Sequence, residues 1–281
     1  MCGRYTLSAG ESEILERFNV DDVFMETRLT PRFNIAPTQD IAVILSQDGK
    51  RVLTAYKWGL IPFWVKDLAQ ARPMINARAE TLPEKPFFKT ALSRRRCIIP
   101  ADGFFEWQSR ADSKTKTPMW IHLSRQGLLD NGQIVAEHSP VLFGFAGLYD
   151  KWKRPDGTLL ETCTIITTSA NQAISPVHER MPVILSKGAE SVWLDATIQD
   201  PQELMQVLHA CPDNIIQMHP VSARVNKPAA QGQDLIEPCV NDDVEAAKEA
   251  KPRTRSKSKA APKGEQYQQI TLPGLNLPES D

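Results

Sequence analysis

The residues of this sequence that could do covalent chemistry begin at Cys2. Because cysteine is small, we expect Met1 to be removed and Cys2 to become the mature N-terminus. Such a residue offers an amine with an ordinary pKa of ~7.7–8.0 beside a thiol of ~8.5. The amine can condense with an aldehyde to give an imine, and the thiol can then close a thiazolidine ring on the same carbon. The alternative is a chance cysteine in a frayed terminus.

Two titratable residues further along the chain could move protons for such a reaction. Glu106 lies among bulky apolar residues in segment 104–107, where burial would raise its carboxyl pKa and allow proton exchange near neutral pH. His178 lies in the loop-like segment 176–182, and an ordinary histidine pKa of ~6.5 suits a proton shuttle. The simpler alternatives are a solvated Glu106 on the outer face of a strand and a structural His178.

Cationic and aromatic residues suited to nucleic acid accompany these candidates. Arg4 is a fixed cation suited to a phosphate. Asn76 and Arg78 are two positions apart, so in an extended segment they point to the same side. Segment 58–64 is rich in large aromatic residues broken by Gly59 and a proline. Such a segment either plugs the core beneath a loop or stacks with unpaired bases, at ~1–3 kcal/mol per stack.

Composition limits the function classes. The 281 residues are 41% hydrophobic and 24% charged, enough for one large or two small domains. The net charge of -1 means that any nucleic-acid contact must come from a local patch. Five cysteines without a CxxC pair argue against a disulfide framework or zinc site, and nucleotide-binding and metalloprotease motifs are absent. We expect no metal or cofactor, no membrane segment and a cytoplasmic location.

Periodicity predicts the elements that must position the candidates. Residues 11–18 predict a helix ending at Asn19. Residues 41–46 and 51–56 predict a hairpin, because Asp48-Gly49 is typical of a tight turn. Further helices are expected at 87–95, 187–195 and 201–210, and further strands at 97–100, 103–107, 119–123, 141–149, 159–168 and 215–218.

The globular pattern covers residues 2–239, with a polar surface insertion at 124–140. Residues 240–264 are basic and poor in large apolar side chains, which predicts a disordered linker. Residues 265–281 carry a short apolar island. There Gln269, Ile270 and Leu272 are similar to the peptides with which bacterial replication proteins bind the sliding clamp, so we expect a docking peptide.

An ordered series of motifs resembles the SRAP (SOS-response-associated peptidase) family of abasic-site processing proteins. The resemblance runs in order from residue 2 to about residue 239. Its motifs are Met1-Cys2-Gly3-Arg4, Phe33-Asn34-Ile35-Ala36-Pro37, Trp58-Gly59 with Pro62 and Trp64, Ile75-Asn76-Ala77-Arg78-Ala79-Glu80-Thr81, Ala101-Asp102-Gly103, Glu106-Trp107, His178-Glu179-Arg180-Met181-Pro182 and His219-Pro220-Val221-Ser222.

The resemblance implies an α+β fold, a single domain of curved, barrel-like antiparallel sheet with peripheral helices. It implies capture of an abasic site in single-stranded DNA by a covalent link to Cys2, assisted by Asn76, Glu106 and His178. We expect a monomer that needs no cofactor. The family's peptidase name fits removal of Met1, which the protein itself could perform. The DNA contacts that the resemblance implies are Arg4, Asn34, Pro37, Trp58, Trp64, Arg78, Trp107, Thr168 and Arg180.

Two other function classes remain open from the residues alone. An N-terminal-nucleophile amidohydrolase, such as a glutaminase that begins with Cys-Gly, accounts for Cys2 but not for the aromatic segment or the arginines. It would release ammonia from glutamine. A scaffold that binds single-stranded DNA and the clamp reversibly would show equal salt sensitivity with intact and abasic DNA, because a covalent bond does not compete with counterions.

Overall fold

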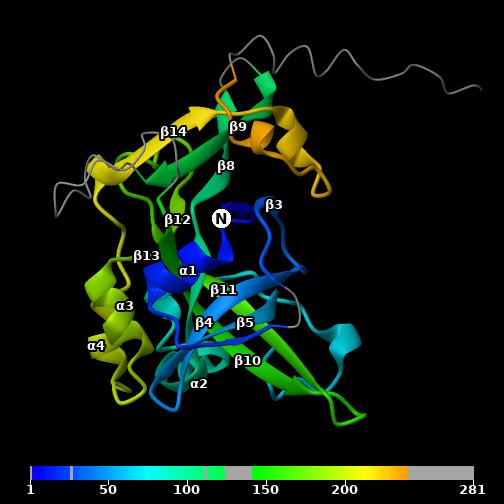
Figure 1. Cartoon of the computed structure of the whole chain (residues 1–281), viewed down its shortest axis with the longest axis vertical. Helices are drawn as coiled ribbons and strands as arrows, with labels where there is room; N and C mark the ends of the chain where they lie inside the picture. The colour runs from blue at the N-terminus through cyan, green and yellow to red at the C-terminus, as the bar shows by residue number, and fades with distance from the viewer. Residues whose placement is uncertain (1, 26–27, 111–112, 124–140, 240–281) are drawn as a thin grey trace, which may run out of the picture.

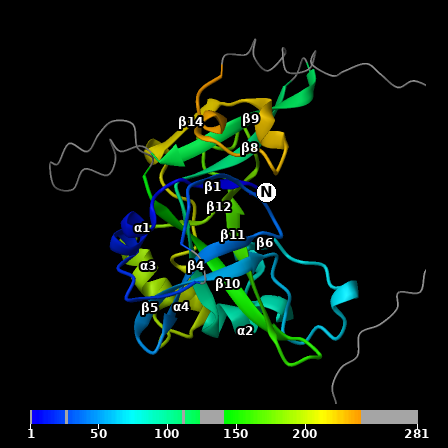
Figure 2. The ribbon, with the colours of Figure 1, turned by 45° about the vertical axis from the view of Figure 1, so that its right-hand side comes forward.

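The structure, a computed structural model, describes residues 2–25, 28–110, 113–123 and 141–239. The predicted insertion (124–140), linker (240–264) and tail (265–281) lie outside the described residues. The described chain is α+β, as predicted, with two sheets and short helices at their periphery (Figure 1, Figure 2). In this part of the chain no helix combines the length and apolarity that a membrane span requires.

The larger sheet closes on itself into a barrel. Its strands are β4 (Asp40–Gln47), β5 (Lys50–Trp58), β7 (Arg96–Ala101), β10 (Phe143–Lys153) and β11 (Leu159–Ser169). Antiparallel pairs join β5 to β4, β4 to β7, β7 to β10 and β10 to β11. A parallel pairing of β11 with β5, at Thr162↔Lys57 and Cys163↔Trp58, completes the ring. The predicted barrel-like sheet is confirmed, and the β11–β5 pairing that closes it is parallel.

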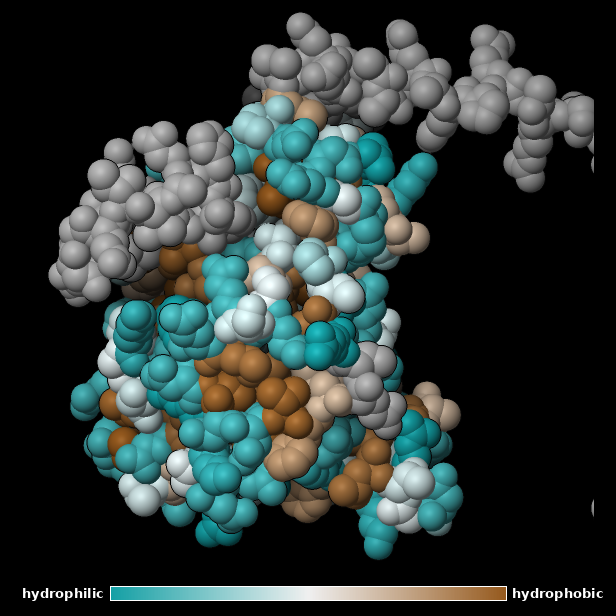
Figure 3. Space-filling view, in the orientation of Figure 1, coloured by the Kyte–Doolittle hydropathy of each residue, from teal (hydrophilic) through white to brown (hydrophobic). Residues whose placement is uncertain are grey.

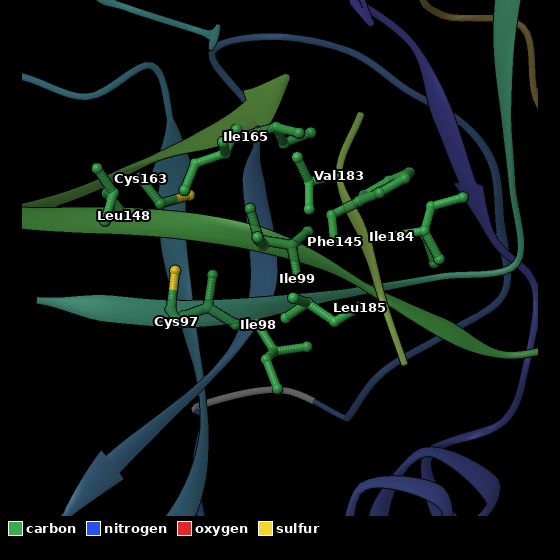
Figure 4. Close-up of a cluster of buried hydrophobic side chains, with 14 of the residues drawn as sticks. Cys97, Ile98, Ile99, Phe145, Leu148, Cys163, Ile165, Val183, Ile184 and Leu185 are labelled. Atoms are coloured by element: carbon green, nitrogen blue, oxygen red, sulfur yellow. The ribbon is translucent and has the colours of Figure 1, made fainter. Parts of the chain in front are cut away.

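Local sequence explains the first hairpin and the tight barrel interior. Asp48 and Gly49 take the left-handed conformation, with φ of 53° and 79°, that a two-residue turn between β4 and β5 needs. Inside the barrel, apolar side chains of β7, β10 and β11 pack together (Figure 4). At Gly147 on β10, an added Cβ would come within 2.9 Å of the Cys97 sulfur. The strands therefore approach closely because this position lacks a side chain.

A second sheet lies beside the barrel and carries the N-terminal strand. In order its strands are β14 (Ile216–Pro220), β9 (Ser113–Leu123), β8 (Gly103–Arg110), β1 (Tyr5–Leu7) and β3 (Arg32–Ile35). The chain leaves the barrel at β7 and enters this sheet at β8, so the predicted strand–turn–strand at 97–107 joins two sheets. Asp102 lies at this crossing and is 1% exposed. Its carboxylate accepts hydrogen bonds from the hydroxyls of Thr6 and Ser8 and from the Ser8 backbone N–H.

The α-helices lie at the periphery, and the other strands are short members of the larger sheet. They are α1 (Glu11–Phe18), α2 (Pro86–Arg94), α3 (Lys187–Leu194), α4 (Pro201–Met205), β2 (Asp22–Phe24), β6 (Asn76–Arg78), β12 (Arg180–Pro182) and β13 (Ile184–Leu185). Helix α1 ends at Asn19 in the left-handed conformation, as predicted. The predicted helix 201–210 is too long, because after Met205 the backbone bonds shorten to i→i+3, as from Leu208 N to Met205 O.

Gly103 begins β8 at a position with no room for a methyl group. An added Cβ would lie 2.3 Å from Nε1 of the Trp120 indole, which is buried and donates to the Thr6 hydroxyl at 3.3 Å. We expect Gly103→Ala to lower the free energy of unfolding by ~1–3 kcal/mol through overpacking, measured by urea denaturation. Gly188→Ala in α3, where nothing lies within 4 Å of the added Cβ, is the matched control. Equal stability of Gly103→Ala and the wild-type protein would contradict this packing.

Candidate functional site

Cys2 lies at the start of the segment that leads into β1 and is fully buried. The Asn76 side-chain amide, on β6, donates to the Cys2 carbonyl oxygen at 2.9 Å. The Phe105 N–H, on β8, donates to the Arg4 carbonyl oxygen at 2.9 Å and so fixes the segment after Cys2. Glu106, next on β8, is 3% exposed, and its carboxylate acts electrostatically on the Cys2 thiol. The structure thus brings Cys2, Asn76 and Glu106 together.

The thiol of Cys2 is held in its protonated form. Its pKa is raised chiefly by burial and further by the negative charge of Glu106. A thiol becomes a good nucleophile only when its proton leaves. The arrangement therefore suits a reaction in which the α-amine acts first and the sulfur acts later, with a proton acceptor at hand. Met1, which acylates that amine in the printed sequence, lies outside the described residues.

His178 is carried to the same end of the barrel by the strands on either side of β11. On one side β6 runs parallel to β11, with Asn76 opposite Ile165. On the other side β12 runs antiparallel, with Arg180 opposite Ser169, and His178 lies two residues before this strand begins. Gln108, two positions after Glu106 on β8, donates to the Pro176 carbonyl of this loop at 3.5 Å. Because alternate residues of a strand share a face, Glu106 faces the same loop.

Comparison with known proteins identifies the family of this chain. Residues 1–228 match the family described as SOS response associated peptidase (SRAP). The chain belongs to the SRAP family. It is 44% identical over 237 residues to the abasic site processing protein YoqW of Bacillus subtilis, a match that covers 84% of this chain and 99% of that one. It is 32% identical over 232 residues to the abasic site processing protein HMCES of Pongo abelii, covering 74% of this chain and 65% of that one.

Solved structures share the SRAP fold of this chain. A protein from Bacteroides thetaiotaomicron is 25% identical and superposes with a TM-score of 0.71, covering 85% of this chain and 100% of that chain. A protein from Bordetella bronchiseptica is 23% identical with a TM-score of 0.63, covering 78% and 99%. The barrel with its attached sheet is therefore a fold that this chain shares with other proteins.

Some of the DNA contacts expected for a SRAP protein lie at the surface. Arg78 is exposed, and Trp64 is 47% exposed beside the Phe87 ring, with ring centroids 5.1 Å apart. Figure 3 shows that apolar patches on the face drawn there are separated by hydrophilic side chains. Pro37 is half-buried and precedes Thr38, whose φ of 71° is unusual for a β-branched residue. Such strain is typical of functional loops.

Trp107 is a half-buried candidate whose orientation is fixed. Its indole N–H donates to the Asn226 side-chain oxygen at 2.7 Å. The Arg4 guanidinium lies 5.9 Å from the centre of the Trp107 ring, within the range of a cation–π contact. Arg4 and Trp107 are therefore two half-buried side chains that hold each other in place.

Two of the residues expected to contact DNA, Trp58 and Asn34, have fully buried side chains in the structure. Trp58 donates its indole N–H to the Ile75 carbonyl at 2.8 Å and packs edge-on against Tyr5. Its ring supports the residue before Asn76 and offers no face to a base. The Asn34 amide donates to backbone carbonyls of segment 225–230 and accepts from Arg4 at 2.9 Å. Asn34 thus ties β3 to the C-terminal part of the domain.

Arg180 and Thr168, also expected to contact DNA, both reach Glu80 in the structure. Arg180 forms a bidentate ion pair with Glu80 at 2.7 and 2.9 Å. Thr168 is 9% exposed, and its hydroxyl lies 3.5 Å from a Glu80 oxygen. The charge of Arg180 is thus already balanced by the Glu80 carboxylate, for which the sequence suggested no separate role.

The clamp residues Gln269, Ile270 and Leu272 lie outside the described residues, and their role stays a prediction.

Asp102 is the positioning residue that sequence reasoning passed over. Burial raises the pKa of its carboxyl, while the hydrogen bonds from Thr6 and Ser8 act in the opposite direction. Its backbone N–H also donates to the Thr6 carbonyl at 3.0 Å. The strand that follows Cys2 is therefore fixed to the crossing between the sheets. The sequence feature that could have indicated this role is a charged residue between two apolar runs, in the motif Ala101-Asp102-Gly103.

Proposed function

We propose that this SRAP protein captures abasic sites in single-stranded DNA by a covalent thiazolidine bond through Cys2. The observation that carries the proposal is the convergence of Asn76 and Glu106, from separate sheets, on Cys2. The relatives YoqW and HMCES are both named abasic site processing proteins. An abasic sugar in its open form presents an aldehyde and has no base to fill the space above the reacting carbon.

The reaction proceeds in two stages once Met1 has been removed. The Cys2 amine adds to the sugar aldehyde, and loss of one water gives an imine. The sulfur then adds to the imine carbon, while the thiol proton passes by way of the Glu106 carboxylate to the ring nitrogen. One C–N and one C–S bond form, and no oxidant or reductant is consumed. The raised pKa of the thiol sets this order, because the sulfur keeps its proton until Glu106 accepts it.

Asn76 and His178 support the two stages in different ways. The Asn76 amide holds the Cys2 carbonyl and so fixes the amine in an attacking position. His178 moves protons at the sugar oxygens as the ring opens and water leaves. Arg78, Trp64, Trp107 and Pro37 line the path of the strand. Binding of the tail to a sliding clamp would raise the local concentration near replication forks.

A denaturing gel tests the proposal directly. A uracil-containing single-stranded oligonucleotide treated with uracil glycosylase should give a slowly migrating adduct with the purified protein, stable to heat and detergent. The untreated oligonucleotide should give none. The absence of adduct from protein shown by mass spectrometry to begin at Cys2 would overturn the proposal. Release of ammonia from glutamine by the same preparation would favour the amidohydrolase instead.

A further inference from the structure

An ion pair bridges the two strands that flank the end of β11. Glu80 lies in the turn directly after β6, and Arg180 begins β12. The pair is bidentate, and the Arg180 guanidinium also donates to the Thr167 carbonyl oxygen of β11 at 2.7 Å. The Arg180 side chain is 11% exposed, whereas that of Glu80 is 47% exposed. Arg180 is therefore a largely buried cation whose position depends on its carboxylate partner.

The backbone of Arg180 contacts the His178 ring. The Arg180 N–H donates to His178 Nδ1 at 2.9 Å, and the Arg180 carbonyl oxygen lies 3.2 Å from the same nitrogen. A backbone N–H is always a donor, so the shorter contact forms only when Nδ1 carries no proton. A neutral ring then carries its proton on Nε2. With a proton on Nδ1 the ring would have to turn toward the carbonyl oxygen.

We propose that Glu80 is a positioning residue which, by holding Arg180, favours the tautomer of the His178 ring that is protonated on Nε2 over the one protonated on Nδ1. This goes beyond the proposed function, and it rests on that function only for the use of the Nε2 proton at the sugar. Loss of the Glu80 charge leaves the Arg180 guanidinium without its partner and favours its movement toward solvent. The backbone N–H of Arg180 donates to His178 Nδ1. Movement of Arg180 therefore weakens the preference for the tautomer that is protonated on Nε2.

The same pair explains why Arg180 differs from Arg78. Arg78 is exposed and can meet a phosphate, whereas Arg180 already binds a carboxylate in a fork geometry that suits guanidinium. The Arg180 hydrogen bond to Glu80 is also the leading cause that lowers the Glu80 pKa, so Glu80 stays charged across the neutral range. Arg180 is thus placed between the Glu80 carboxylate and the His178 ring.

Long-range proton–nitrogen correlation spectra of the His178 imidazole, recorded on the full-length protein without DNA at pH 8, test the proposal. We expect the wild-type Nδ1 to give the shift of an unprotonated nitrogen and Nε2 that of a protonated one. Glu80→Gln should raise the ratio of the Nδ1-protonated to the Nε2-protonated form by about tenfold. Arg180→Lys, which keeps the charge but loses the fork, should move the ratio in the same direction. A His178→Gln spectrum assigns the signals among the five histidines.

The matched control is Glu161→Gln. It removes the carboxylate of another ion pair of the same length, 2.7 Å to Lys151, and should leave the tautomer unchanged. A wild-type ring protonated on Nδ1 would overturn the proposal. So would Glu80→Gln and Arg180→Lys proteins that fold and give the wild-type spectrum. Since no DNA is present, these results are independent of whether the protein captures abasic sites.

Discussion

Cys2→Ala is expected to form no adduct with abasic single-stranded DNA that survives denaturation. Alanine keeps the terminal amine, so an imine can still form, but it lacks the sulfur that closes the ring and water reverses the imine. Cys2→Ser should likewise give an adduct visible only after trapping with borohydride. The measurement is the fraction of labelled oligonucleotide shifted on a denaturing gel, with and without reductant.

The control for the Cys2 series is Cys239→Ser. Cys239 is partly exposed and lies at the far end of the described domain, so its replacement should leave the adduct yield unchanged. A Cys2→Ser adduct that resists heat without reductant would rule out ring closure by sulfur. Mass spectrometry must show that each variant has lost Met1, because an acylated nitrogen cannot form an imine.

Glu106→Gln is expected to slow adduct formation by about 10²–10⁴-fold, the usual contribution of a positioned general acid–base group. Glutamine fills nearly the same volume in this buried position, so packing is preserved, but its amide cannot take the thiol proton. Removal of the charge also takes away one cause of the raised Cys2 pKa, yet burial, the larger cause, remains. The single-turnover rate of adduct formation is the quantity to measure.

A matched variant separates chemistry from general charge effects in that experiment. Glu84 is exposed in the turn before α2, so Glu84→Gln changes the net charge equally and should react at the wild-type rate. Thermal denaturation of Glu106→Gln should show that the fold is retained. A Glu106→Gln rate within threefold of wild type would exclude Glu106 as the proton acceptor.

Features encoded over a few neighbouring residues could be predicted from the sequence, and features set by distant pairings could not. The β4–β5 hairpin and the end of α1 follow from Asp48-Gly49 and Asn19, whose backbone preferences are local. Besides its neighbour β9, strand β8 pairs with β1, about a hundred residues earlier in the chain, and no local pattern predicts such a pairing. The unpredicted strands β1, β2, β3, β6, β12 and β13 have only two to four residues each, too few for a clear periodicity.

The candidate site shows the same division. The types of Cys2, Glu106 and Asn76 suggested their chemistry, and the fold places them together. Trp58 and Asn34 were expected to touch DNA because of the resemblance to the SRAP family. Their burial shows that they hold the elements that carry the site. A residue's type says what it can bind, but only the three-dimensional packing says whether a ligand can reach it.

The bonds from Asn34 to segment 225–230 restrict how this protein can be shortened for expression. The family match ends at residue 228, yet Asn34 donates to the Ala230 carbonyl at 3.0 Å and Gln231 accepts from the Phe33 N–H at 3.0 Å. A truncation at that boundary would free the edge of β3, next to the strand that follows Cys2. Affinity tags and fusion partners should accordingly be joined after residue 239, where neither that edge nor the reactive amine is disturbed.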